Sequence, residues 1–262
     1  MPTPRLLFSS AAFFGRPLAE TFELVADSGY TGVEVMVTRD PASQDAAWMQ
    51  RLAEAHGLRI GAIHAPCLLV TRRIWGADPI GKIERAVEVA SDAEVPVVVM
   101  HPPYRWQSMY RTWITDVLPE VEQHSGVTVA IENMFPVRVG NRQLAFHANQ
   151  DLADLEGIPH LVLDTSHAAV ARHDLVSVRR RFGDRLRHVH LSDNLGRGWD
   201  NHLPPGEGIL PLDDFLDDLA ASGYTGSVSL EVDLRRVSDD PARLRSVMAS
   251  MRDRVEERLA RA

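Results

Sequence analysis

Cysteine is almost missing from this sequence, because Cys67 is the single one among 262 residues. That count excludes an intramolecular disulfide and fits a reducing compartment, so we expect a cytoplasmic protein. Long apolar runs are missing as well. None approaches the roughly 18 residues that cross a bilayer, and we expect no membrane partner. The short N-terminal run LLFSSAAFF is followed by no clear cleavage site, and we interpret it as a strand rather than a signal peptide.

Basic residues are outnumbered: 28 Lys and Arg stand against 36 Asp and Glu, which gives a formal net charge of −8. A protein that binds nucleic acid through its phosphates usually presents a basic face. The charge therefore weighs against a nucleic-acid partner without excluding one, because bound divalent cations would reverse the local field. Apolar residues make up 45% and charged residues 24%, the proportions of a globular protein with a buried core.

Short apolar runs recur at intervals of about thirty residues, the length of one βαβ unit. Most are continuously apolar, which is typical of strands buried on both faces. Amphipathic segments lie between them, such as 77–93 and 212–226, and the second contains Gly223, a natural C-cap. The eight strands expected from these runs are 5–10, 32–37, 59–66, 95–102, 127–134, 160–167, 186–193 and 227–232.

Eight strands that alternate with eight helices in about 250 residues are what a (β/α)8 barrel requires. We therefore predict an α/β protein that consists of a single (β/α)8 TIM-barrel domain over residues 1–262. A doubly wound open sheet is the competing architecture. The regular repeats and the absence of a GxGxxG turn make it the weaker one.

Titratable side chains gather at the C-terminal ends of these expected strands, where the active sites of TIM barrels lie. Each alone is typical of a hydrogen-bonded structural residue or a helix N-cap. Together in one cavity they cost several kcal/mol per buried charge unless something compensates them. Divalent cations do so, and carboxylates with imidazoles suit a catalytic zinc, manganese or similar ion. The residues are His64, His101, Glu132, Asp164, His167, His188, His190 and Glu231, with Asp193, Asp200 and His202 in the loop after the seventh strand.

His188 and His190 lie two positions apart on one strand and therefore point to the same face. We expect His190 to be the metal ligand because it lies nearer the strand end. His188 is expected to pack one layer deeper or to support the ligand. Asp193 is expected to cap its loop or to support the site rather than to bind the metal.

Five short motifs resemble those of a known superfamily. They are IEN at 131–133, LDTSH at 163–167, HVHLSDN at 188–194, DNHLPPGEG at 200–208 and SLEV at 229–232. In this order, on the last four expected strands, they look like the xylose-isomerase-like TIM barrels, and the resemblance covers essentially the whole chain. That superfamily contains sugar and sugar-phosphate isomerases and epimerases, together with abasic-site nucleases of the endonuclease IV type.

The resemblance implies one of two metal centres. In the isomerase and epimerase branch, one divalent ion (manganese, cobalt, magnesium or zinc) would be held by Glu132, Asp164, His190 and Glu231, and the two glutamates would also serve as acid and base. In the nuclease branch, three zinc ions would be held by nine ligands: His64, His101, Glu132, Asp164, His167, His190, Asp200, His202 and Glu231.

The loop after the seventh strand favours the first branch. It is compact, as in many sugar-isomerase-like members, and it has Asn201 where the nuclease pattern has an arginine. The acidic balance also fits a small polar substrate better than a DNA duplex. Against this stands the full set of nine ligands, which an epimerase does not need, so the abasic-site nuclease remains the alternative.

We therefore predict a divalent-metal-dependent isomerase or epimerase of a small sugar, a sugar phosphate or a related polyol ketone. One of Glu132 and Glu231 would remove the proton α to a metal-bound carbonyl, giving an enediolate, and the other would return a proton. The sequence leaves their order open. His167 is expected either to donate to the developing oxyanion or to orient Asp164. A binding module without turnover is disfavoured by the presence of both glutamates, and a homo-oligomer is compatible with the sequence.

Aromatic residues between the fourth and fifth expected strands allow two interpretations. Trp106, Met109 and Trp113 are spaced as one face of a helix that packs on the barrel. Alternatively, Trp106, or Trp199 in the loop after the seventh strand, stacks against the face of a sugar ring. Core packing is favoured over the wedge against a DNA duplex that the nuclease alternative would need, whereas stacking on a sugar stays equally open.

Overall fold

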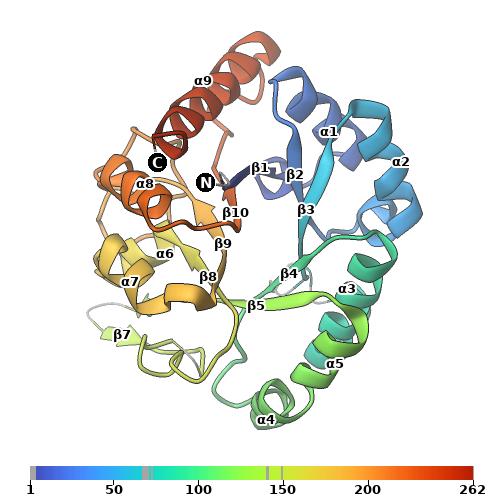
Figure 1. The fold of residues 1–262 in the computed structure, drawn as a ribbon, viewed down its shortest axis with the longest axis vertical. Helices are drawn as coiled ribbons and strands as arrows, with labels where there is room; N and C mark the ends of the chain where they lie inside the picture. The colour runs from blue at the N-terminus through green and yellow to red at the C-terminus, as the bar shows by residue number, and fades with distance from the viewer. Residues whose placement is uncertain (1–3, 67–70, 72, 140–141, 149, 262) are drawn as a thin grey trace.

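Eight parallel strands close into a barrel in this computed structural model, which describes residues 4–66, 71, 73–139, 142–148 and 150–261 (Figure 1). All eight strands predicted from the apolar runs are present, and the (β/α)8 fold class is confirmed. Around the barrel the order is β1, β10, β9, β8, β5, β4, β3 and β2, which pairs again with β1. The bounds are β1 Arg5–Ser9, β2 Gly32–Met36, β3 Arg59–His64, β4 Val97–Met100, β5 Thr128–Glu132, β8 Leu161–Asp164, β9 Leu186–Leu191 and β10 Ser227–Leu230.

Helices surround the barrel on its outside (Figure 1). Both helices predicted from amphipathic patterns are present. Helix α3 begins after Asp78, whose carboxylate accepts hydrogen bonds from the backbone N–H groups of Ile80 and Gly81. Helix α8 ends just before Gly223, which adopts the left-handed φ of +72° that favours glycine. The helices are α1 Leu18–Asp27, α2 Ala46–His56, α3 Pro79–Asp92, α4 Ser108–Asp116, α5 Leu118–Ser125, α6 Thr165–Val170, α7 Leu175–Phe182, α8 Leu212–Ala221 and α9 Pro241–Leu259, with short 3-10 helices η1 Ser10–Phe13, η2 Pro41–Gln44 and η4 Gly183–Arg185.

The two faces of the strands carry different chemistry. Side chains that point outward, such as Val33 and Val35 of β2, join the large apolar core between strands and helices. A second, small apolar cluster joins Val99, Ala130 and Val162 from β4, β5 and β8. Because side chains alternate along a strand, Ala130 lies on the same face of β5 as the Glu132 carboxylate. The polar site at the strand ends therefore stands on a small apolar layer.

The expected packing face of Trp106, Met109 and Trp113 is wrong for two of its three residues. Helix α4 begins at Ser108, so Trp106 precedes it, and the exposed fractions of Trp106 and Met109 are 67% and 79%. The buried face of α4 consists of Tyr110, Trp113 and Ile114. For Trp106 the regular spacing misled because it was carried across the start of the helix, where the period of 3.6 residues does not yet apply. Met109 lies in the first turn of α4 and is exposed all the same.

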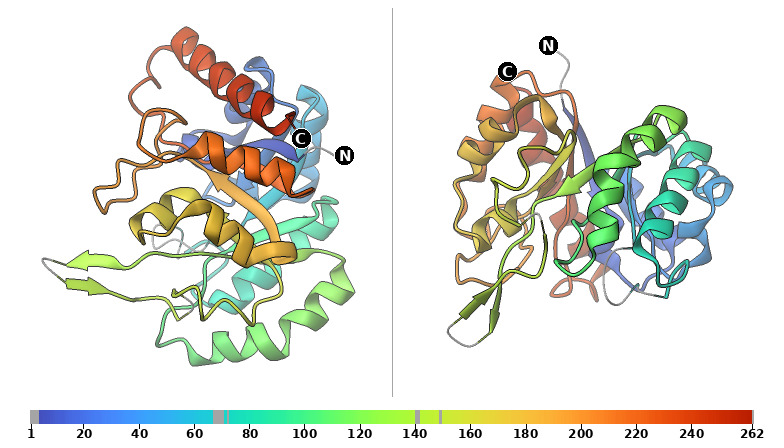
Figure 2. Two further views of the ribbon diagram at one scale, coloured as in Figure 1. Left: turned by 60° about the vertical axis from the view of Figure 1, so that its left-hand side comes forward. Right: turned by 90° about the horizontal axis from the view of Figure 1, so that it is seen from below.

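An additional hairpin, which the sequence did not suggest, follows β5. Strands β6 (Val137–Val139) and β7 (Arg142–Leu144) pair in antiparallel fashion and extend away from the barrel (Figure 2). The exposed side chains of Val137 and Leu144 lie opposite each other on this hairpin. Among the helices of the described residues, none has the length and apolar character needed to cross a membrane.

Candidate metal centre

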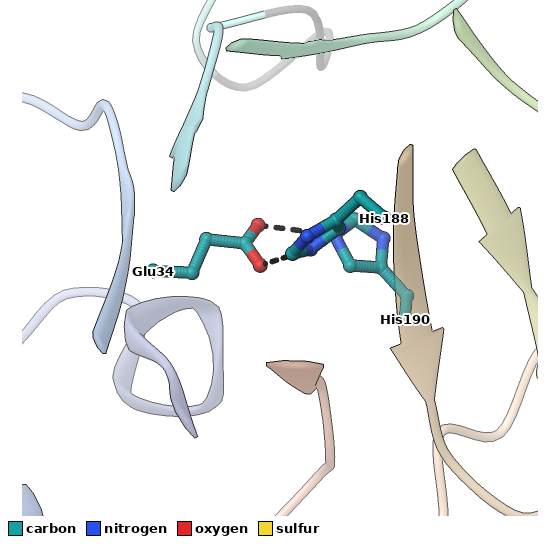
Figure 3. Close-up of side chains that lie close together, drawn as sticks. All are labelled: Glu34, His188 and His190. Carbon is teal, nitrogen blue, oxygen red and sulfur yellow. Dashed lines mark hydrogen bonds and ion pairs between the residues drawn. The ribbon is translucent and has the colours of Figure 1, made fainter. Parts of the chain in front are cut away.

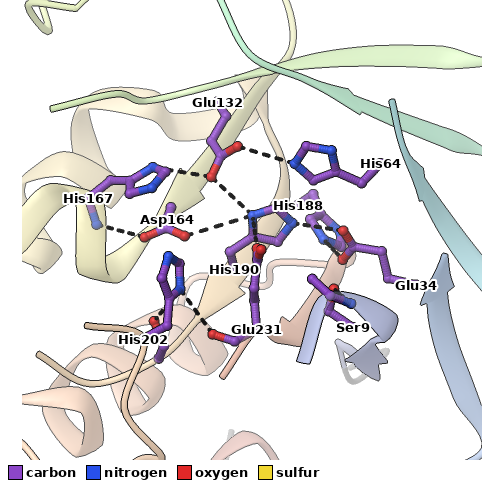
Figure 4. A network of polar contacts seen from close by, with 12 residues as sticks. Ser9, Glu34, His64, Glu132, Asp164, His167, His188, His190, His202 and Glu231 are labelled. Atoms are coloured by element: carbon purple, nitrogen blue, oxygen red, sulfur yellow. Dashed lines mark hydrogen bonds and ion pairs between the residues drawn. The ribbon is translucent and has the colours of Figure 1, made fainter. Parts of the chain in front are cut away.

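Four predicted ligands meet because their strands end at one level. Glu132 and Asp164 are the last residues of β5 and β8, and Glu231 directly follows β10. The parallel register pairs Asp164 with His190 on β9 and Ser229 of β10 with the same histidine. As a result, one ligand atom from each of the four lies within 4.8 Å of the others (Figure 4).

The Nδ1 atom of His190 is the centre of this group. It lies 2.9 Å from Oε2 of Glu231, 3.1 Å from Oε1 of Glu132 and 3.9 Å from Oδ2 of Asp164. Two buried oxygens, Oε2 of Glu132 and Oδ2 of Asp164, accept no hydrogen bond from any described residue. Buried carboxylate oxygens without a donor are costly, and a divalent cation satisfies them. The donor set therefore fits a divalent ion.

The electrostatics of the group are those of tightly coupled charges. Burial raises the pKa of Glu132, but the His190 and His167 imidazoles outweigh burial and hold it well below the usual range. Burial lowers the pKa of His190, yet Glu34, Glu231 and Glu132 raise it well above the ordinary value. For Asp164, burial outweighs the nearby imidazoles and raises the pKa to about 6.

A second group, His64 and His101, lies on the β3 and β4 side of Glu132. Nε2 of His101 is 3.2 Å and Nε2 of His64 is 3.7 Å from Oε2 of Glu132, so this oxygen has imidazole neighbours although neither forms a hydrogen bond to it. Nδ1 of His64 donates to the carbonyl of Ala65, which leaves Nε2 turned toward the carboxylate. The three side chains could hold a further ion.

A third group lies on the opposite side, near the loop after β9. Ligand atoms of Asp164, His167 and His202 lie within 4.8 Å of one another. The Asp200 carboxylate lies 2.8 Å from Nε2 of His202 and 3.4 Å from Nε2 of His167. Burial lowers the pKa of His202, but Asp200 and Asp164 outweigh it and raise the pKa to about 10. All nine predicted site residues therefore gather at one end of the barrel in three adjoining groups.

His167 and Asp164 are joined through the backbone and not through the imidazole. The backbone N–H of His167 donates to Oδ1 of Asp164, which thereby caps α6. Nδ1 of the His167 ring donates to the carbonyl of Asn133 at 2.9 Å. The backbone N–H of His167 thus holds Asp164, while the His167 ring makes its hydrogen bond to Asn133.

The loop that carries Asp200 and His202 is fixed by Asp193. The Asp193 carboxylate accepts hydrogen bonds from the backbone N–H groups of Asn194, Gly206 and Leu210. Asp193 and Leu203 also exchange both of their backbone hydrogen bonds. The Asp193 carboxylate thus holds the loop together, in line with the expected capping role.

Glu34 is a buried residue that sequence reasoning missed. It lies in the middle of β2 and is fully buried, with its carboxylate between Nε2 of His188 and Nε2 of His190 (Figure 3). His188 lies deeper on β9 and its ring contacts Glu34 and Ser227 rather than the candidate ligand carboxylates. The signal in the sequence was a glutamate inside the apolar run GVEVMV, where a strand buried on both faces has no reason to carry a charge.

Aromatic rings extend from His101 toward the surface. His147, also missed, packs edge-on against His101 at 6.4 Å, and Tyr104 stacks on His147 at 4.7 Å. Exposed Trp106 lies parallel to Tyr104 at 4.8 Å. The backbones of Tyr104 and His147 are joined by an isolated antiparallel bridge. Ring contacts therefore connect His101, beside the candidate metal centre, with the exposed Trp106.

Fold and site together define a family. Residues 22–254 match the family described as xylose isomerase-like TIM barrel, and the chain belongs to it, which confirms the resemblance seen in the motifs. An uncharacterised protein of Mycobacterium tuberculosis is 36% identical over 250 residues, 88% of this chain and 89% of that protein. Fructoselysine 3-epimerase of Escherichia coli O157:H7 is 29% identical over 119 residues, 44% of this chain and 42% of the epimerase. A solved structure of a D-tagatose 3-epimerase-like protein has the same fold, with a TM-score of 0.72 at 20% identity over 97% of this chain and 98% of that chain.

Proposed function

We propose that this protein is a divalent-metal-dependent isomerase or epimerase of a small sugar, a sugar phosphate or a related polyol ketone. The observation that carries the proposal is the meeting of Glu132, Asp164, His190 and Glu231 around two buried carboxylate oxygens without a hydrogen-bond donor among the described residues. The match to fructoselysine 3-epimerase supports chemistry on a sugar. The fold shared with a D-tagatose 3-epimerase-like protein is compatible with it.

These four side chains would hold one ion. Oxygen and imidazole donors without thiolates suit manganese, cobalt, magnesium or zinc. When bound, such an ion polarises a substrate carbonyl as a Lewis acid. Oδ1 of Asp164 accepts the hydrogen bond from the first turn of α6. Oδ2, the other oxygen, faces His190.

Glu132 and Glu231 are the proposed acid and base. They approach Nδ1 of His190 from two different strand ends. Burial raises the pKa of both carboxyls, but His190 outweighs burial and lowers it, so each is ionised and able to accept a proton. One removes the proton α to the carbonyl. The other returns a proton, to the opposite face for epimerisation or to the adjacent carbon for isomerisation.

His167 is proposed as the donor to the oxygen on which charge develops. Burial lowers its pKa, but Asp164, Asp200 and Glu132 outweigh burial and raise it well above the ordinary value, so both ring nitrogens carry protons. Nδ1 donates to Asn133, and Nε2 is directed toward Asp200. A substrate oxygen can compete with Asp200 for that second proton.

Exchange of substrate hydrogen with solvent tests the proposal. The ion-loaded protein is incubated in D2O with a panel of ketoses and ketose phosphates, and NMR follows deuterium at the carbon next to the carbonyl. We expect incorporation with at least one substrate, and its loss in Glu132→Gln. If the protein with verified ion content incorporates deuterium into none of them, the proposed reaction is wrong.

A second function is favoured by one specific observation, the gathering of all nine side chains of the trinuclear pattern. The groups around His64 and His202 adjoin the central four-residue group on its two sides. We propose, as the alternative, a trinuclear zinc phosphodiesterase that acts on abasic-site DNA. The presence of Asn201, where the nuclease pattern has an arginine, is evidence against this alternative function. Three zinc ions per chain together with cleavage of an abasic-site duplex would favour this function over the first.

A further inference from the structure

Glu34 connects two histidines by a single carboxylate. Nε2 of His190 lies 3.0 Å from Oε1, and Nε2 of His188 lies 2.9 Å from Oε2 (Figure 3). All three side chains are fully buried. None of the steps derived above uses Glu34, although a buried carboxylate must have strong partners to be tolerated.

The hydrogen bonds fix which nitrogen carries each proton. An ionised carboxylate only accepts, so both Nε2 atoms must donate. On the far side of His188, the Ser227 hydroxyl lies 2.7 Å from Nδ1 and donates to it. When His190 holds a single proton, that proton is therefore on Nε2. Its lone pair is on Nδ1, the atom that faces Glu132, Asp164 and Glu231.

We propose that Glu34 is a positioning residue for the metal centre: it holds His190 as the Nε2–H tautomer, with Nδ1 directed at the ion, and strengthens that ligand with its negative charge. The inference rests on the proposed metal site. A carboxylate behind a ligating histidine fixes the orientation of the ring and raises its basicity, and its loss typically weakens metal affinity about 10- to 100-fold. The arrangement in this chain has all the parts of that device.

Glu34→Gln is the informative substitution, because the barrel interior can accommodate it. The amide oxygen can still accept from His190, while the amide nitrogen donates to His188. His188 then shifts its proton to Nδ1 and donates to the Ser227 oxygen. Shape and hydrogen bonds survive, and only the charge is lost. We expect the Kd for Mn²⁺ or Co²⁺, measured by calorimetry, to rise about 10- to 100-fold, with one ion per central site as before.

Ser227→Ala is the matched control. It removes a buried hydrogen bond from the same network but leaves the Glu34 charge and its bond to His190 in place. We expect ion affinity close to that of the unaltered chain. An equal loss in both variants would show that general damage to the network, and not the charge of Glu34, lowers affinity. That result would overturn the proposal.

NMR of the zinc-loaded, unaltered chain with 15N-labelled histidine gives a readout that does not depend on any variant folding. We expect a His190 ring with a proton on Nε2 and a zinc-shifted Nδ1. A zinc-shifted Nε2 overturns the inference, as does an unchanged Kd in Glu34→Gln or the loss of one whole ion, which would mean that Glu34 is itself a ligand. If the unaltered chain binds no ion, the proposed metal centre fails as well, so the two failures are distinguishable.

Discussion

Oε2 of Glu231 lies 2.9 Å from Nδ1 of His190, and this contact joins the ends of the neighbouring strands β10 and β9. Burial lowers the pKa of His190, but Glu34, Glu231 and Glu132 outweigh burial and raise it well above the ordinary value. A proton on Nδ1 and a divalent cation would compete for the same carboxylates. The proposed ion binding at this site is therefore expected to release protons.

The first prediction concerns that coupling. We expect ion binding to release protons and to weaken as the pH falls, because the raised pKa of His190 keeps its second proton in place at neutral and acidic pH. Calorimetric titration in buffers of different ionisation enthalpy measures the number of protons released. Mass spectrometry of protein purified without chelator gives the number of ions, one in the favoured function and three in the alternative. Binding without proton release would contradict the geometry described for Nδ1.

The second prediction concerns the two glutamates. Replacing Glu132 or Glu231 by Gln keeps the shape but removes the base, and general acid–base groups contribute about 10²- to 10⁴-fold. We expect kcat of the isomerase or epimerase to fall by at least that factor in either variant. Asp233→Asn is the control. Like Glu231, Asp233 follows strand β10, but its carboxylate pairs with the exposed Arg235. If both Gln variants have verified ion content and still turn over substrate at the original rate, Glu132 and Glu231 are not the acid and base.

The third prediction separates one ion from three. His202 has a φ of +44°, a left-handed conformation that Asn tolerates better than most residues, so His202→Asn removes the imidazole without straining the backbone. In the single-ion function the four central ligands remain, and we expect one ion and most of the activity to be retained. In the trinuclear function, the ion shared with Asp200 is lost. Ion counting on the two proteins side by side decides between them.

The fold was predictable because its signal is repeated. Each of the eight apolar runs was weak evidence alone, but their spacing left few architectures, and parallel strands buried on both faces are read from composition alone. The gathering of the candidate ligands was predictable for a related reason. Strand ends in a TIM barrel converge on one face, so residues such as His64 and Glu231, far apart in the sequence, could be placed together before their contacts were known.

What escaped prediction depends on three-dimensional packing. Glu34 lies in mid-strand, and only the closed barrel brings it against His188 and His190. His147 reaches the site through an isolated bridge to Tyr104, a pairing with no periodic signal. The hairpin consists of strands β6 and β7, which have three residues each. Strands this short do not show a recognisable alternation of apolar and polar residues.

The fourth prediction concerns stability at acidic pH. Burial lowers the pKa of His147 to about 4, although its bond to the Pro102 carbonyl acts in the opposite direction. In the unfolded chain, the His147 imidazole takes up a proton near its ordinary pKa of about 6.5. Between about pH 6.5 and pH 4 the unfolded state therefore binds more protons than the folded state, and the free energy of unfolding decreases as the pH is lowered. The loss is complete below pH 4 and amounts to about 3 kcal/mol at most.

Urea unfolding of the ion-free protein between pH 7 and pH 4 measures this loss. In His147→Gln, whose amide can still donate to Pro102, we expect a shallower dependence of the unfolding free energy on pH. Replacing the exposed His124 by Gln is the control, because it removes an imidazole from the surface rather than from the ring stack beside the candidate site. If the His147 variant and the control follow the same curve as the unaltered chain, His147 does not contribute to acid sensitivity.

The last prediction concerns the loop after β9. A Cβ on Gly208 would overlap the Asp193 carboxylate and the carbonyl of Asn194, both of which are held in place by hydrogen bonds within the loop. Neither can move without giving up bonds to Gly206, Leu210 or Ile209. Overpacking of this kind costs about 1 to 3 kcal/mol. We therefore expect Gly208→Ala to lower the unfolding free energy by that amount and to displace Asp200 and His202.

Gly157→Ala is the matched control, because an added Cβ there meets nothing within 4 Å and should leave stability nearly unchanged. If both alanine variants unfold at the same urea concentration as the unaltered chain, the loop can rearrange freely and Asp193 does not fix the position of Asp200 and His202.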